Sequence, residues 1–594
     1  MKLSLVAATL FLAATAQAAP AVGDTIRVAD FGVRPGTYRN MTPQLQAAID
    51  SCRAHPGAVL LFEPGRYDLW QEGAVRKEIY ISNTSSETEA PDKTKVIPLH
   101  FYNLDGLTVV GNGATLMMHG LMTPIAIDSC LNVTLSDLTI DYERPAASEL
   151  TYTEVAPGRV VVRVHPDTRY DISPAGRLRL IGEGWASERI HCIKLHNNGH
   201  FRYSNDWGVL ASAPVKEIEP HLLEFTVPED FTPAVGETLT LRDIIRYQVG
   251  MLNLCSSGTT LRDVRVRFMH GLGIVSQYSR DITMERVDCR PDEHSGRKLA
   301  SSADFMHFSG CSGHIEITQC NYAGAQDDAI NVHGTNLRAV EQLGSKALRL
   351  RFMHHQTYGF LAYQPGDTVA FVNPHTMLRT DTAVVASVAM ADRRNLDVTF
   401  DRPVPRSIEI GATCVENLTA TPTLHVAGCT FTRQSTRGIL ASTPRSVVIE
   451  HNRFDRLGMA AILIEGDAEG WYESGPVTNV VIRDNEFIDC GYAGATHGAT
   501  IALNPSNTVI DPRYPVHENV RITGNRFITS GRPVLFAKST GNLLFMGNTV
   551  ESASAPKFLL NGCRDVTITG NRMPAPQVEE RDCLSVPVEE SAAR

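Results

Sequence analysis

The chain has 594 residues, a formal net charge of −10 and 20% charged residues. This length allows one large domain with insertions and a sizeable buried core. The acidic balance and the lack of Lys/Arg clusters in the sequence argue against a nucleic-acid partner and favour a neutral or cationic substrate, because phosphate binding needs a concentrated basic surface.

Residues 1–18 have the features of a secretory signal peptide. Lys2 is followed by an apolar run from Leu3 to Ala14, and Ala16-Gln-Ala18 places small residues at a cleavage point. The apolar run is too short to span a membrane, and no later stretch is apolar for about 18 residues. No Cys follows the cleavage point to carry a lipid. We therefore expect a periplasmic or secreted protein without a membrane span.

A short helix between two strands is predicted near the start of the mature chain. Thr42 precedes Pro43, and apolar residues recur at helical spacing from Leu45 to Cys52. We interpret Thr42 as the N-cap and Pro43 as the first helical residue. Flanking Phe-Gly and Pro-Gly-x-Tyr segments complete an arrangement that covers the open end of many parallel β-helices. This segment therefore resembles the start of proteins of the pectate-lyase-like superfamily.

Short alternating runs recur along the chain and end at small or polar corner residues. Five corners hold asparagine, at steps of 33, 40, 23 and 23 residues: Asn452, Asn485, Asn525, Asn548 and Asn571. The pattern extends backwards at steps of 23, 109, 33, 23 and 126 residues, through Cys429, Cys320, Val287, Val264 and Leu138. Such a repeat predicts a solenoid. Because the runs suit strands of about three to five residues, we predict an all-β, right-handed parallel β-helix with an N-terminal capping helix.

Two long steps in the repeat mark insertions near 146–246 and 337–419. Both segments alternate apolar and polar residues with period two, so we expect two inserted antiparallel β-barrel-like modules. They leave the helix on either side of the central coils, where they can wall a site. The remaining parts are the N-terminal cap and first coils (19–145), the central coils (247–336), and the C-terminal coils and tail (420–594).

The central coils carry three aspartates that the repeat brings together. Asp304 lies in Ser-Ser-Ala-Asp-Phe-Met-His-Phe, and Asp327 and Asp328 lie in Gly-Ala-Gln-Asp-Asp-Ala-Ile-Asn-Val-His-Gly. Asp304 and Asp327 are 23 residues apart, so we expect them on neighbouring strands, about 4.8 Å apart. Repulsion at that spacing raises the pKa of at least one carboxyl and favours a shared proton. An Asp-Asp pair alone is often a turn cap, but the third aspartate favours acid–base chemistry.

These motifs resemble those of known glycosidases. An Asp at this spacing before an Asp-Asp pair is similar to the catalytic centre of polygalacturonases, which are inverting enzymes. However, the first motif here is Ser-Ala-Asp-Phe rather than Asn-Thr-Asp, and an Arg-Ile-Lys segment is missing, so an acidic sugar is not expected. The string from Gln326 to Gly334, with the signal peptide, capped β-helix and two modules, resembles glycoside hydrolase family 110, the exported bacterial α-1,3-galactosidases.

The family resemblance implies a function and a mechanism. It implies removal of terminal α-1,3-linked galactose from oligosaccharides or glycoconjugates, as on blood-group-B-type glycans, with inversion and without a metal or other cofactor. Inversion needs an acid and a base roughly 6.5–9.5 Å apart across the sugar ring. Similarity to polygalacturonases suggests Asp327 as the acid, with Asp304 and Asp328 holding the water. The reverse assignment stays open.

Six further residues are candidates for substrate binding. Two histidines and an asparagine follow the aspartates, a Gln and a Glu follow apolar strands on flanking coils, and a Trp lies in a lengthened loop where it can stack on a sugar. Each of them also has a structural interpretation, as a packed or hydrogen-bonded side chain. These candidates are His307, His333, Asn336, Gln277, Glu465 and Trp471.

Other functions remain compatible with the pattern. A polygalacturonase-like or lyase-like enzyme could act on another polysaccharide, but a lyase needs a basic residue, and none lies near the aspartates in sequence. A non-catalytic glycan-binding solenoid gives no reason to pack like charges together. The 12 cysteines lie largely in apolar runs and form no CxxC pair, so we expect mostly unpaired buried thiols. The oligomeric state is open, and a homodimer is compatible with the sequence.

Overall fold

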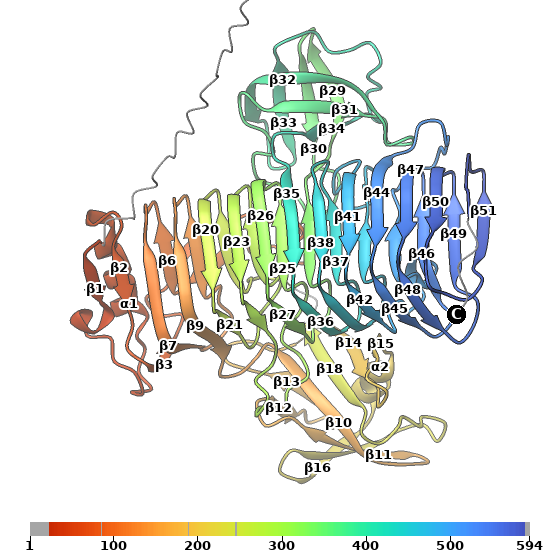
Figure 1. The fold of residues 1–594 in the computed structure, drawn as a ribbon. Coiled ribbons are helices and arrows are strands. Elements are labelled where there is room, and N and C mark those ends of the chain that lie inside the picture. The colour runs from red at the N-terminus through yellow and green to blue at the C-terminus, as the bar shows by residue number, and fades with distance from the viewer. Residues whose placement is uncertain (1–22, 85, 188, 244–245, 589–594) are drawn as a thin grey trace, which may run out of the picture.

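The computed structural model describes residues 23–84, 86–187, 189–243 and 246–588. The predicted signal peptide at 1–18 lies outside these residues. Within them the chain winds into a long parallel β-helix, and one inserted module projects from each side of it (Figure 1). In the described residues, no helix is long and apolar enough to cross a membrane. The predicted all-β parallel β-helix is confirmed.

The predicted capping helix is α1 (Thr42–Ser51), which has Pro43 in its first turn and packs against the first coil. Its residues Leu45 and Ile49 are buried in the main core, which they close at the N-terminal end. The predicted N-cap is wrong by one residue, because Met41 occupies that position. The Thr42 hydroxyl instead donates to the carbonyl of Trp70 at 2.9 Å, which ties the helix to the following strand.

One long parallel sheet forms the face of the β-helix that carries the candidate site. Its strands are stacked in chain order, and each pairs with the strand of the next coil. They are β6 (Leu99–Tyr102), β8 (Ile125–Asp128), β19 (Met251–Leu254), β22 (Ile274–Gln277), β25 (Met306–Ser309), β28 (Ile330–His333), β37 (Ile439–Ser442), β40 (Ile462–Ile464), β43 (Ile501–Leu503), β46 (Pro533–Lys538), β49 (Lys557–Asn561) and β51 (Gln577–Arg581).

The predicted repeat is confirmed on the other faces of the helix, which form a second parallel sheet. Its strands β36 (Thr430–Gln434), β39 (Arg453–Leu457), β42 (Glu486–Ile488) and β45 (Arg526–Thr529) pair at offsets equal to the predicted steps of 23, 33 and 40 residues. Aromatic rings from successive coils stack inside, with centroids 4.6 Å apart for Phe431 and Phe454, and 5.0 Å for Phe454 and Phe487. Such stacking fills the core at each coil with the same side-chain type.

The corner asparagines form a hydrogen-bonded ladder. The amide nitrogens of the Asn452 backbone and side chain donate to Asn485 Oδ1 at 2.9 and 3.0 Å. The same two contacts repeat along the ladder to Asn571. Further back, the sulfur of Cys429 takes the acceptor position, since the Cys320 amide donates to it at 3.4 Å. The twelve cysteines all lie in the described residues and are free thiols, most of them buried, as predicted.

Replacing one rung of this ladder should destabilise the protein without touching the candidate site. In Asn485→Ala, the Asn452 amide and the carbonyl of Ile449, 2.9 Å from Asn485 Nδ2, both lose a buried partner. We expect the free energy of unfolding to fall by about 2–4 kcal/mol, measured by chemical denaturation. The exposed Arg521→Ala control should change it by less than about 0.5 kcal/mol. Equal stability of both variants would show that the ladder adds little.

The two insertions form separate antiparallel modules (Figure 1). The first is a sheet in the order β15-β14-β18-β10-β11-β17-β16 with a hairpin and a helix, and the second closes into a barrel in the order β29-β30-β33-β32-β31-β34. The first module comprises β10 (Ala147–Ala156), β11 (Arg159–Val164), β12 (Arg169–Ile172), β13 (Leu178–Ile181), β14 (Ile190–Leu195), β15 (Phe201–Tyr203), α2 (Asp206–Ser212), β16 (Val215–Glu219), β17 (Leu222–Thr226) and β18 (Thr238–Asp243). The barrel comprises β29 (Leu337–Gly344), β30 (Ala347–Arg351), β31 (Thr368–Val372), β32 (Arg379–Met390), β33 (Asn395–Phe400) and β34 (Cys414–Asn417).

Candidate active site

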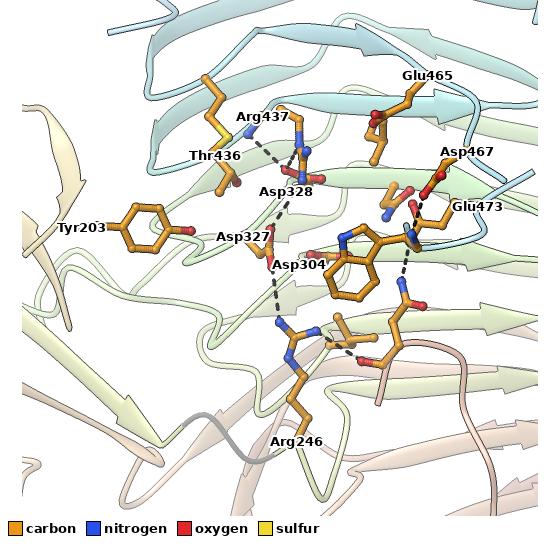
Figure 2. Close-up of a pocket in the computed structure, with 16 residues that line it drawn as sticks. Tyr203, Arg246, Asp304, Asp327, Asp328, Thr436, Arg437, Glu465, Asp467 and Glu473 are labelled. Carbon is orange, nitrogen blue, oxygen red and sulfur yellow. Dashed lines mark hydrogen bonds and ion pairs between the residues drawn. The ribbon is translucent and has the colours of Figure 1, made fainter. Parts of the chain in front are cut away.

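A cavity of about 260 Å³ opens on the face of the site sheet and contains the three aspartates. Asp304 immediately precedes β25, and Asp327 and Asp328 precede β28, so the starts of two neighbouring strands place them at the same level. In Figure 2 the aspartates lie between Tyr203 on one side and Glu465, Asp467 and Glu473 on the other. The predicted meeting of Asp304, Asp327 and Asp328 is therefore present in the fold.

The register of the aspartates differs from the prediction by one residue. Met306 pairs with Ile330, and the Phe305 amide donates to the carbonyl of Asp328 at 3.0 Å. These coils are therefore offset by 24 residues on this face, and Asp304 aligns with Asp328 rather than with Asp327. The 23-residue step belongs to another face, and the length of each corner decides how the faces are offset from one another.

Two arginines flank the aspartates. Arg437 donates to Asp328 Oδ1 through its Nε at 2.7 Å and its backbone amide at 3.1 Å. Arg246 Nη2 donates to Asp327 Oδ2 at 3.3 Å. The expectation that no basic residue lies near the aspartates was thus wrong in space, because Arg437 follows the inserted barrel and Arg246 lies at the end of the first module.

Burial raises the pKa of several carboxyl groups around the cavity. Burial, and then the charge of Asp327, raises the pKa of Asp304 well above its ordinary value. Burial raises the pKa of Asp328 to about 7, although the paired Arg437 opposes this. Burial also raises the pKa of Glu465 to about 7, again against the effect of Arg437. The cluster therefore retains protons at neutral pH, as acid–base chemistry requires.

The two predicted histidines lie beneath the aspartates, outside the cavity lining. His307 on β25 and His333 on β28 are both buried, and His307 Nδ1 is 2.8 Å from Asp304 Oδ2. His307 Nε2 is 3.0 Å from His333 Nε2. Burial lowers the pKa of His307 to about 4 and also lowers the pKa of His333, so both rings are neutral near pH 7. Direct contact with a sugar, as predicted, is not supported; they act through Asp304.

Two other predicted binding residues support loops and are outside the described cavity lining. Gln277 on β22 is buried; it accepts from the Ser82 amide at 2.8 Å and donates to the carbonyl of Tyr80 at 3.0 Å. Asn336 is also buried and donates to the carbonyl of Asp467 at 2.9 Å. The predicted sugar contacts of Gln277 and Asn336 are therefore corrected to positioning of loops that border the cavity.

Glu465 and Trp471 do line the cavity. Glu465 directly follows β40, whose register sets its position. The loop that holds Trp471 is shaped by Asp467, whose carboxylate accepts from the amides of Glu469 and Gly470 at 2.8 and 2.9 Å. The indole is 46% exposed, and its centroid lies 4.2 Å from the imidazole of His354, which comes from the barrel segment. An exposed, supported indole of this kind can stack on a sugar face.

Several lining residues were missed by the sequence analysis. Arg437 is the one with a signal, because Ile330 pairs with Ile439 at the same 109-residue step that separates Cys320 from Cys429. The others come from loops and the first module, where no repeat applies. They are Asn83, Tyr203, Arg246, Asp467 and Glu473.

A small carboxylate-rich cavity on the wall of a parallel β-helix defines a carbohydrate-active enzyme. The chain is 52% identical over 556 residues to alpha-1,3-galactosidase A of Bacteroides fragilis (strain ATCC 25285), with 92% of each chain covered. It is 34% identical over 569 residues to alpha-1,3-galactosidase B of Bacteroides thetaiotaomicron, with 93% of this chain and 91% of that one covered. This protein belongs to that galactosidase family, glycoside hydrolase family 110, as the motifs predicted.

The barrel and the fold have matches of their own. The family described as "GLAA-B beta-barrel domain II" matches residues 347–412, within the second module. Among solved structures, the catalytic unit of a thermostable α-1,3-glucanase from Streptomyces thermodiastaticus is similar, with a TM-score of 0.38 and 10% identity. That similarity covers 96% of this chain and 69% of the other.

Proposed function

We propose that the protein is an inverting exo-glycosidase that removes terminal α-1,3-linked galactose from glycans such as the blood group B antigen. The observation that carries the proposal is the convergence of three aspartates in one cavity, in a chain 52% identical to an enzyme named alpha-1,3-galactosidase A. A cavity of about 260 Å³ is at the small end of ligand sites, which start near roughly 300 Å³. This size suits one terminal sugar.

In the proposed mechanism, Asp327 is the general acid. Its side chain is the most exposed of the three, at 27%. It gives a proton to the glycosidic oxygen as the bond from that oxygen to the anomeric carbon breaks. Asp304 and Asp328, aligned on neighbouring strands, take a proton from a water whose oxygen bonds to the anomeric carbon from the opposite face. A base with a pKa near 7 suits this step at neutral pH.

The reverse assignment has one observation in its favour. The raised pKa of Asp304 keeps that carboxyl protonated, as an acid must be, while Arg246 beside Asp327 favours the anion a base needs. Asp304 would then protonate the leaving oxygen, and Asp327 would activate water. The two assignments differ in which variant tolerates a better leaving group.

A lyase mechanism is less well supported by the same geometry. A lyase needs an unprotonated basic residue to remove a proton from its substrate. Burial opposes the charge on Arg437, but pairing with Asp328 and Asp327 outweighs it and raises the pKa of Arg437. This guanidinium stays protonated and serves to hold carboxylates or a sugar hydroxyl.

The test is hydrolysis of a panel of α-1,3-, α-1,4- and α-1,6-linked galactosides, with branched fucosylated and linear acceptors, followed by NMR. We expect galactose from the α-1,3-linked substrates, with the β-anomer appearing first because inversion forms it. First appearance of the α-anomer would contradict inversion. An unsaturated product would indicate a lyase, and binding without product would indicate a glycan-binding solenoid.

Export and assembly are further parts of the proposal. We propose that residues 1–18 direct export, which mass spectrometry of the mature N-terminus tests; a start near residue 19 supports it. The homodimer stays a prediction, which light scattering tests.

A further inference from the structure

Asp304 is one end of a buried chain of polar contacts that runs behind the cavity. It contacts His307, and His307 contacts His333, at the distances given above. His333 Nδ1 is 2.6 Å from the carbonyl oxygen of Gly334, and its Nε2 is 3.8 Å from Glu473 Oε1. Since Asp304 and Glu473 both line the cavity, the two imidazoles connect two of its walls from beneath.

The hydrogen atoms of this chain can be assigned from the chemistry of its ends. A carbonyl oxygen only accepts, so His333 Nδ1 carries a hydrogen, and in the neutral ring Nε2 is then an acceptor. The hydrogen between the rings therefore belongs to His307 Nε2. Neutral His307 has a bare Nδ1, and its 2.8 Å contact with Asp304 Oδ2 is a hydrogen bond only when that carboxyl is protonated.

We propose, on the basis of the galactosidase mechanism above, that His307 and His333 are positioning residues that hold the resting proton on Asp304 and conduct it away when water attacks. At rest, the other oxygen of Asp304 is an acceptor facing the cavity. When it takes a proton from water, Asp304 Oδ2 passes its own proton to His307 Nδ1. The proton on His307 Nε2 then moves to His333 Nε2. One proton has travelled from water to His333, and Asp304 is an anion.

The charges around the chain support this transfer. Burial raises the pKa of Glu473, but His333, His307 and the Asn83 amide, 2.6 Å from Oε1, outweigh it, so the pKa is lowered and the group is a carboxylate. This anion stabilises a proton on His333, as the new charge on Asp304 does from the other end. The charged groups acting on the two rings are Asp304, Asp327, Asp328 and Glu473, which favour the cation, and Arg246, which opposes it.

The first test is His333→Gln. A glutamine amide can accept from His307 and donate to the Gly334 carbonyl, but it cannot take up a proton. We expect kcat to fall roughly 10²-fold with KM within about twofold, and loss of the basic-side dependence of kcat on pH. The control is His517→Gln, another buried histidine, on β44 (His517–Thr523), which should keep kcat. A folded His333→Gln enzyme with kcat within about threefold of wild type would overturn the transfer.

The second test uses the unmodified protein and does not depend on activity. Neutron diffraction of the free enzyme near pH 7 is expected to show deuterium on Asp304 Oδ2, His307 Nε2 and His333 Nδ1. Deuterium on His307 Nδ1 with a bare Asp304 carboxylate would overturn the assignment. If no galactoside is cleaved, the proposed function fails while this proton assignment stands; if galactosides are cleaved and deuterium lies elsewhere, only the assignment fails.

Discussion

Asp327→Asn is expected to lower turnover of an α-1,3-linked galactosyl disaccharide roughly 10³-fold or more. A sugar alkoxide is a poor leaving group, and asparagine cannot supply the proton that it needs. With 4-nitrophenyl α-galactoside the loss should be much smaller, because nitrophenolate leaves without protonation. Measuring kcat/KM for both substrates in wild type and variant gives the two ratios to compare.

The matched control is Asp304→Asn on the same two substrates. A base variant should lose activity on both to a similar extent, because water activation does not depend on the leaving group. Added azide, which needs no deprotonation, should restore turnover of Asp304→Asn and form β-galactosyl azide. If Asp304→Asn rather than Asp327→Asn shows the dependence on leaving group, Asp304 is the acid. If both variants keep near-normal activity while folded, this cavity is not the active site.

Asp304→Asn is also expected to stabilise the protein above neutral pH while removing its activity. The pKa of Asp304 in the folded protein is raised above the unfolded value of about 3.9, so the folded state binds more protons between these two values. Wild type therefore loses stability as pH rises through the folded-state pKa. Asparagine does not ionise, and its amide can donate to His307 Nδ1 as the protonated carboxyl does.

We expect Asp304→Asn to exceed wild type in free energy of unfolding by about 1–3 kcal/mol near pH 9, with little difference near pH 4. Urea denaturation at both pH values measures this. The exposed Asp230→Asn control should change stability by less than about 0.5 kcal/mol at either pH. Equal stability of wild type and Asp304→Asn near pH 9 would mean that Asp304 ionises in the folded protein without cost.

Much of the fold follows from the sequence because the β-helix is built from local, repeated interactions. Each coil places an asparagine at one corner and, on most coils, a phenylalanine two residues later, and each contacts its equivalent on the next coil, as for Asn452 with Asn485 and Phe454 with Phe487. Equivalent positions are therefore visible as a spacing. The breaks in that spacing located both inserted modules, and the same ruler brought Asp304 close to Asp327 and Asp328.

The sequence by itself therefore determined the solenoid, the places of its two insertions and the trio of aspartates. Only the tertiary structure decided that Asp304 aligns with Asp328, because corner lengths offset each face separately. It also decided the partners of the trio, since Arg246 and Glu473 reach the cavity from segments outside the repeat. The positions of such segments depend on many weak packing contacts between distant parts of the chain, and no spacing in the sequence records them.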